Sequence, residues 1–199
     1  RQVEELMHNY GSIDILWLDG GWVRPTETVT NEVKAWGMRI PEWSQDIDVP
    51  AIATMARQAQ PGLLIVDRTV HGPYENYQTP EQSIPKEQLN YPWESCMTLC
   101  ETWSWSNTPS KSKKELIDML TATACGNGNM LLSWGPKWDG EFDSSQSNRL
   151  IETGNWLKKY GYTIYNTKGG PWYPAEWGGS TYTGKKVYLH ITDKSLKQL

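Results

Sequence analysis

Helix-like segments alternate with short apolar runs along most of this 199-residue chain. Each segment carries apolar residues at helical spacing, and each following run has the length of one strand. Because an intervening helix returns the chain to the same end of a sheet, strands connected in this way pair in parallel. The helix–strand pairs are residues 1–10 with 13–18, 48–60 with 63–68, and 113–125 with 129–134. The alternation predicts an α/β fold whose sheet is covered on both faces.

A fourth strand is expected over residues 97–103, and a further helix over residues 144–161. Three helix–strand repeats and one extra strand are too few to close an eight-stranded (β/α) barrel, but they match its later half. Beyond Gly169 the chain is rich in glycine, proline and tryptophan before the strand-like residues 187–192. We expect antiparallel β-structure there.

Charge and cysteine usage exclude several classes of protein. The net charge is −4 and the basic run at 111–114 is short, so we expect no nucleic-acid partner. No window approaches the roughly 20 apolar residues of a membrane span. The three cysteines lack zinc-ligand spacing, and their odd number prevents complete pairing. They are therefore interpreted as buried free thiols, with no metal site.

The aromatic residues are unevenly distributed among types, with 12 tryptophans and 10 tyrosines against one phenylalanine. Indole and phenol rings combine a flat apolar face with a hydrogen-bonding edge, and such faces stack on sugar rings. An ordinary core that uses tryptophan explains the same composition equally well. The composition alone leaves both interpretations open.

Reactive side chains stand where the apolar runs end. Asp19 follows the first run, Arg68 the second, and Trp103 the predicted third strand. In a (β/α) barrel the active site lies at the carboxyl ends of the strands, so these groups are expected to share one rim. Gly20 and Gly21 allow a sharp turn that can bring Trp22 back beside the carboxylate. The motif LDGG alone would favour a plain turn, but the arginine and the indoles favour a sugar site.

The segment from 69 to 92 has no periodicity and contains four prolines, which is typical of functional or disordered loops. Glycoside hydrolases commonly use two carboxyl groups, one of which donates a proton. A loop glutamate suits that role because loop closure can remove it from water. The candidates are Glu75, Glu81, Glu87 and Glu94. Most loop glutamates are merely solvated, so position alone does not choose among them.

Several motifs together resemble the α-L-fucosidases of glycoside hydrolase family 29. They are DILWLDGGW (14–22), VDR (66–68), YQTPEQ (77–82), PWESCMTLCETWSW (92–105), NGNMLLSWGPKWDG (127–140) and RLIETGNWLKKYGYTIY (149–165). The resemblance implies a retaining hydrolase that releases terminal α-L-fucose from fucosylated oligosaccharides or glycoconjugates through a covalent glycosyl-enzyme. It implies no cofactor and a periplasmic or secreted location, and it gives no oligomeric state.

The resemblance also implies roles for individual residues. Asp19 corresponds to the nucleophile and Glu81 to the acid/base, with Glu94 as an alternative acid/base or an orienting group. The implied sugar-contacting residues are Arg68, Trp103, Trp22 and, as the one histidine able to approach the site, His71. Val66 stands where the family often has asparagine, and the family's early strands with their fucose-binding histidines are absent from these residues.

The resemblance divides the chain into two parts. Residues 1–168 would be the C-terminal part of a TIM-like (β/α) barrel catalytic domain, and residues 169–199 a linker with the first strands of an antiparallel β-sandwich. Because the chain opens within a helix-like segment, we expect it to be the middle of a longer protein. Three alternatives are a non-catalytic sugar-binding module, a retaining glycosidase for another sugar, and a piece that is inert and aggregates alone.

Overall fold

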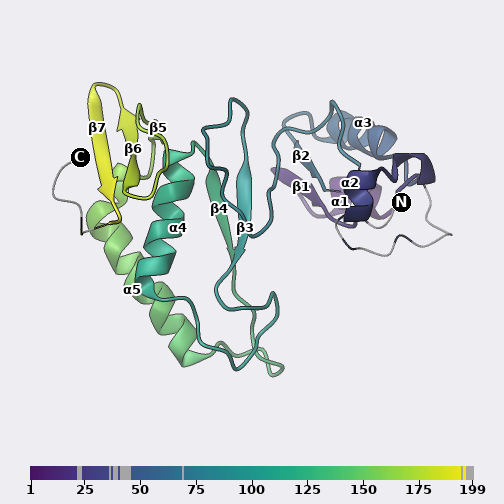
Figure 1. Ribbon diagram of the computed structural model, residues 1–199. Coiled ribbons are helices and arrows are strands. Elements are labelled where there is room, and N and C mark those ends of the chain that lie inside the picture. Colours follow the sequence, from purple (N-terminus) through teal and green to yellow (C-terminus); the bar gives the residue numbers. More distant parts are fainter. Residues whose placement is uncertain are drawn as a thin grey trace. The chain divides into compact units, whose positions relative to one another are not determined.

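The computed structural model describes residues 1–21, 24–35, 37, 40, 46–68, 70–193 and 195. The chain forms two compact units, Arg1–Gln78 and Thr79–Leu199. Each unit contains parallel strands and helices, as Figure 1 shows, and each is described by itself. The expected α/β character is therefore present in both units.

The first unit is built on a two-stranded parallel sheet. Its elements are α1 (Gln2–Asn9), β1 (Ile15–Leu18), η1 (Thr26–Thr28), α2 (Asn31–Ala35), α3 (Val49–Ala59) and β2 (Leu64–Asp67). Leu18 is the register partner of Asp67, and the amide of Arg68 donates to the Leu18 carbonyl at 3.0 Å. The two strands therefore end side by side, and whatever follows them lies at one edge of the sheet.

Local signals define the helices of this unit. The Asp48 carboxylate accepts from the amide of Ala51 and caps α3, as the sequence predicts. Gln60 joins three segments, because its side chain accepts from Ile13 N at 2.7 Å and donates to Met7 O at 2.8 Å. The buried apolar core consists of Met7, Leu16, Ala53, Ala56, Leu63 and Ile65. α1 and α3 thus pack together beside the sheet.

The second unit contains another parallel pair and an antiparallel sheet. Its elements are β3 (Glu94–Thr98), α4 (Lys113–Cys125), β4 (Asn129–Ser133), α5 (Ser144–Tyr160), η2 (Gly161–Thr163), β5 (Lys168–Gly169), β6 (Gly178–Thr183) and β7 (Lys186–Ile191). β3 pairs in parallel with β4, and the three C-terminal strands pair in the order β5-β6-β7. The antiparallel structure expected beyond Gly169 is confirmed.

Packing in this unit depends on close contacts with glycine. The Trp93 ring is 1% exposed, and its Nε1 donates to the Gly126 carbonyl at 3.1 Å. β6 contacts α4, where a Cβ on Gly179 would lie 3.0 Å from the sulfur of Cys125. All three cysteines are free and buried, as expected, and burial raises the pKa of the Cys125 thiol to about 12.

Three sequence-based expectations are wrong in detail. β3 covers 94–98 rather than 97–103, because hydrogen bonds to β4 begin at the Trp93 carbonyl and the chain bends after Leu99. The sequence predicts a polar loop from the end of the first strand to about Gln45, but Asn31–Ala35 form the short helix α2. The sequence predicts that Leu116, Leu120 and Ala124 share the inner face of α4, but only Leu116 is fully buried, together with Thr121, Thr123 and Cys125.

Candidate active site

Asp19 and Arg68 meet where β1 and β2 end. The Arg68 guanidinium lies 3.6 Å from the Asp19 carboxylate, with side chains 16% and 53% exposed respectively. The Gly20 amide donates to the same carboxylate at 2.9 Å, and Gly20 has a φ of +121°, which glycine adopts readily. The first unit thus places an accessible carboxylate beside a largely covered cation, as the strand-end argument predicts.

Trp17 supports the arginine from the preceding strand. The centre of the Arg68 guanidinium lies 5.0 Å from the centroid of the Trp17 ring, a cation–π distance. Trp17 is half-buried, and its register partner is Val66 on β2. Stacking on a strand residue restricts the long arginine side chain, so its charge stays at the strand ends.

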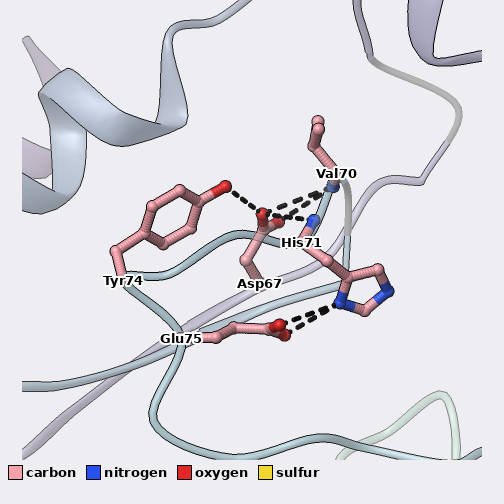
Figure 2. A network of polar contacts seen from close by, with 5 residues as sticks. All are labelled: Asp67, Val70, His71, Tyr74 and Glu75. Carbon is pink, nitrogen blue, oxygen red and sulfur yellow. Dashed lines mark hydrogen bonds and ion pairs between the residues drawn. The ribbon is translucent and has the colours of Figure 1, made fainter.

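Asp67 organises the turn after β2 (Figure 2). Its side chain is fully buried and accepts from the Tyr74 hydroxyl at 2.7 Å and from the His71 amide at 3.0 Å. The Val70 amide contributes a third, longer bond at 3.3 Å. Burial, followed by the bond to Asp67, raises the pKa of the Tyr74 phenol, so the phenol stays protonated and donates. A buried carboxylate with several donors fixes the turn's backbone.

His71 and Glu75 form a pair at the edge of this network. Nδ1 of the imidazole lies 3.0 Å from both Glu75 carboxylate oxygens. The hydrogen bond from Glu75 raises the pKa of His71, and partial burial opposes that shift. The His71 side chain is 50% exposed while that of Glu75 is 10% exposed. The glutamate is therefore the anchored member and the imidazole the presented one.

Arg24 contributes a second cation to the same region of the first unit. The residue is 2% exposed. Burial lowers the pKa of its guanidinium, and the negative charge of Asp67 opposes that shift. A buried guanidinium needs such a compensating charge, because an unpaired one costs several kcal/mol. Asp67 therefore supports the turn through hydrogen bonds and balances a buried positive charge.

Glu81 lies in the second unit and is fixed through its backbone. It forms a parallel bridge with Cys96 of β3, flanked by a bond from Cys96 N to Pro80 O at 3.1 Å and one from Gln82 N to Cys96 O at 2.8 Å. Gln82 has a φ of +50°, and its side-chain amide donates to the Thr98 hydroxyl at 3.0 Å. The Glu81 residue is exposed, although its backbone is held in place by these bonds.

Glu94 differs from Glu81 in both position and exposure. It is the first residue of β3, opposite Asn129 of β4, and it is half-buried. Residues 94 and 96 lie on the same face of the strand because side chains alternate. A glutamate within a paired strand has less freedom to approach a ligand than one in a loop, which agrees with its interpretation as an orienting group.

Trp103 lies five residues after the end of β3, not on the strand as expected. Its residue is 44% exposed, and its carbonyl accepts from the Ser133 hydroxyl at 3.4 Å. Gly135 permits the close approach of this segment, since a Cβ there would lie 2.5 Å from Trp105 N. Beside it, the Trp134 and Phe142 rings stack with centroids 3.8 Å apart. The end of β4 thus carries an aromatic surface, and the exposed indole of Trp103 lies in the segment that contacts it.

The expected site residues therefore divide between the two units. Asp19, Arg68 and His71 belong to the first unit, and Glu81, Glu94 and Trp103 to the second. Trp22 lies outside the described residues. Sequence reasoning missed Asp67, Tyr74, Glu75 and Arg24 as supporting groups. The spacing of His71 and Glu75, four residues apart after a strand-end arginine, was the available signal.

Two features are absent from the part of the chain that the structure describes. No group of three histidine, cysteine, aspartate or glutamate side chains is placed to hold a metal ion there. No helix in these ranges is long and apolar enough to cross a lipid bilayer.

Comparison with known proteins shows the family of this chain. The family model described as Alpha-L-fucosidase matches residues 1–162. An alpha-L-fucosidase of Branchiostoma floridae is 28% identical over 204 residues, covering 96% of this chain and 42% of the relative. Human plasma alpha-L-fucosidase is 27% identical over 172 residues, covering 83% of this chain and 34% of the relative.

Solved structures give the same result. Alpha-L-fucosidase isoenzyme 1 from Paenibacillus thiaminolyticus superposes with a TM-score of 0.78 at 31% sequence identity, covering 97% of this chain and 46% of that one. The alpha-fucosidase of Thermotoga maritima superposes with a TM-score of 0.70 at 25% identity, covering 94% and 40%. The chain spans less than half the length of these relatives.

Proposed function

Because this chain belongs to the α-L-fucosidase family, glycoside hydrolase family 29, we propose that the full-length protein is a retaining α-L-fucosidase. Its substrates are oligosaccharides or glycoconjugates that carry terminal α-L-fucose. The observation that carries the proposal is the ion pair at the ends of β1 and β2, where Arg68 lies 3.6 Å from the half-exposed Asp19 carboxylate. An accessible carboxylate beside a fixed cation is the arrangement that a glycosidase nucleophile needs.

In the first step Asp19 attacks the anomeric carbon of fucose. The bond between that carbon and the glycosidic oxygen breaks as the new ester bond forms, and Glu81 gives its proton to the departing oxygen. Glu81 suits this role because it is an exposed residue on a segment whose backbone is fixed beside β3.

In the second step Glu81 takes a proton from water, and the resulting hydroxide attacks the anomeric carbon. The ester to Asp19 breaks, and fucose leaves with its original anomeric configuration. Two displacements at one carbon require the two carboxyl groups to lie ~5–5.5 Å apart in the working enzyme. No metal or cofactor takes part in this sequence.

The remaining residues bind the sugar. Arg68 donates to fucose hydroxyls, Trp103 and Trp22 provide flat apolar surface, and His71 contacts a hydroxyl. Residues 1–168 form the later part of a (β/α) barrel, and residues 169–199 begin the β-sandwich. A periplasmic or secreted location fits a substrate carried by glycans.

Substitution of Asp19 tests the nucleophile. In the full-length protein, Asp19→Ala should lower kcat on an aryl α-L-fucoside by about 10³-fold or more, because no group remains to form the ester. Added azide should restore part of the activity and give fucosyl azide of inverted configuration. Asp14→Ala, five residues earlier in the same segment, is the matched control. Normal turnover by Asp19→Ala would exclude this assignment.

Substitution of Glu81 tests the acid/base. Glu81→Ala should lower activity on substrates with poor leaving groups by about 10²–10⁴-fold, and much less on activated aryl fucosides. Glu94→Ala and Glu87→Ala are measured alongside. If Glu94→Ala gives the leaving-group dependence and Glu81→Ala does not, the two glutamates exchange roles.

A further inference from the structure

The turn after β2 holds a histidine in an unusual backbone conformation. His71 has a φ of +65°, in the left-handed region that costs a non-glycine residue about 1 kcal/mol or more. Its amide donates to the buried Asp67 carboxylate at 3.0 Å, and Tyr74 binds the same carboxylate. Surrounding bonds therefore determine this conformation, and the direction of the imidazole is set by the fold.

Glu75 then fixes the orientation of the ring. A carboxylate only accepts hydrogen bonds, so Nδ1 of His71, 3.0 Å from both Glu75 oxygens, must carry the proton. The second ring nitrogen, Nε2, points away from Glu75 in Figure 2. The ring is thus held at one nitrogen and presents the other, on a side chain that is half exposed.

We propose that Glu75 is a positioning residue, which holds His71 so that its Nε2–H donates a hydrogen bond to one hydroxyl of the bound sugar. This inference rests on the proposed fucosidase function. A sugar hydroxyl both donates and accepts, and an imidazolium N–H is a stronger donor than a neutral one. Three residues take part in this arrangement: His71, Glu75 and Asp67, whose carboxylate holds the His71 amide.

The charges around the ring favour the donating form. Glu75 and Asp67 raise the pKa of His71, and the positive charge of Arg24 and partial burial lower it; the net shift is upward. Above this raised pKa, Nε2 loses its proton and becomes an acceptor. Sugar affinity should therefore fall as pH rises through the pKa of His71, and removal of the Glu75 charge should move that fall to lower pH.

Arg68 connects the His71–Glu75 pair with the proposed nucleophile, Asp19. It lies three residues before His71 in sequence and pairs with Asp19. Both side chains follow β2 at the edge where the nucleophile stands. A sugar bound against Asp19 and Arg68 would therefore be expected to meet the His71 ring with one of its hydroxyl groups.

The test uses the full-length protein with Glu75→Gln, Glu75→Asp and His71→Gln, and with Glu4→Gln on the exposed face of α1 as control. ¹⁵N NMR of the histidine side chains gives the His71 protonation state directly, without any need for activity. Glu75→Gln should lower the His71 pKa, Glu75→Asp should retain part of the upward shift, and Glu4→Gln should have no effect. Added L-fucose should shift the Nε2 resonance of wild type.

Kinetics with an aryl fucoside and its 2-, 3- and 4-deoxy analogues identify the contact. His71→Gln should reduce kcat/KM by about 10- to 100-fold, mainly through KM, on substrates that keep the contacted hydroxyl. The reduction should disappear for the one analogue that lacks this hydroxyl. In Glu75→Gln the alkaline decline of kcat/KM should begin at lower pH.

Two NMR results would each overturn the inference: an Nε2 resonance that L-fucose leaves unchanged, or an unchanged His71 pKa in Glu75→Gln. If wild type hydrolyses no fucoside but L-fucose still shifts Nε2, the proposed function fails and the His71 contact stands. If wild type is active and His71→Gln reduces kcat/KM equally on every deoxy analogue, the proposed function stands and the assigned contact is wrong.

Discussion

Asp19 stands at the end of β1 among charged side chains, whereas Glu81 is held at β3 by main-chain hydrogen bonds. In the first unit Arg68, Asp67 and the His71–Glu75 pair fix the strand ends through side-chain contacts. In the second, main-chain hydrogen bonds join Cys96 to Pro80 and Gln82, the residues on either side of Glu81. The first region should therefore respond to single side-chain changes and to pH, and the second to changes of backbone.

Removal of Asp67 should give the largest loss of stability. Asp67→Ala removes a negative charge that acts on the buried Arg24 guanidinium and takes away the acceptor for Tyr74. The expected destabilisation of the full-length protein is about 3–5 kcal/mol, measured by chemical denaturation. Asp118→Ala, which breaks only the ion pair to Lys114 on α4, should cost no more than about 1 kcal/mol. Equal losses of unfolding free energy in both variants would contradict the view that side-chain contacts hold the first region together.

The segment that carries Glu81 should be sensitive to proline and tolerant of side-chain truncation. Gln82→Pro removes the amide bonded to Cys96 O and forces φ from +50° to about −65°, at a cost of about 3 kcal/mol. Gln82→Ala keeps the amide and loses only the bond to Thr98, at a cost of about 0.5–1.5 kcal/mol. Activity on poor leaving groups should fall strongly in Gln82→Pro alone. Similar effects of both variants would show that the side chain, not the backbone, places Glu81.

Gly135→Ala should disturb the aromatic surface after β4. The added Cβ would lie 2.5 Å from Trp105 N and 2.8 Å from the carbonyl carbon of Ser104, and backbone atoms cannot simply rotate away. We expect a loss of about 1–3 kcal/mol from overpacking and a several-fold rise in KM as the Trp103 segment moves. Gly154→Ala on α5 has open space around its Cβ and serves as control. An unchanged KM in Gly135→Ala would argue against sugar contact by Trp103.

His71 and His190 should give the smallest effects on stability, with opposite dependences on pH. The pKa of His71 is raised above its ordinary 6.5 by Glu75, so its contribution to stability is complete below pH 6.5 and is lost as pH rises through the folded value. The pKa of His190 is lowered below 6.5 by burial, so stability is lost as pH falls below 6.5. Chemical denaturation between about pH 5 and 8 measures the free energy of unfolding at each pH. The loss of stability at high pH should weaken in His71→Gln, and the loss at low pH should weaken in His190→Gln. If both substitutions changed the pH dependence of stability in the same direction, the opposite pKa shifts of the two histidines would be wrong.

Features that depend on local sequence were predictable. The Ser112–Glu115 capping box and the Asp48 cap are visible in the sequence and occur in the structure, because a cap involves only neighbouring residues. Gly11, with a φ of +89°, follows α1 as expected. The parallel pairing of β1 with β2 also followed from the helix–strand alternation, since it requires only that consecutive strands be neighbours.

Features that depend on distant contacts were not predictable. β3 begins at Glu94 because this residue pairs with Asn129, the first residue of β4. The two residues are 35 positions apart in the sequence. The bridge between Glu81 and Cys96 likewise has no signature in either segment. Asp67 reads as one more strand residue in the sequence, yet its burial makes it the centre of the first unit's polar network.

Covalent trapping tests the central claim most directly. Incubation of the full-length protein with a 2-fluoro-fucosyl reagent slows hydrolysis of the ester, so mass spectrometry of digested peptides can locate the attached sugar. The proposal predicts one fucosyl adduct, on the Asp19 carboxylate, which disappears in Asp19→Ala. An adduct on Glu81, Glu94 or any other carboxylate, or steady hydrolysis with no adduct, would contradict it.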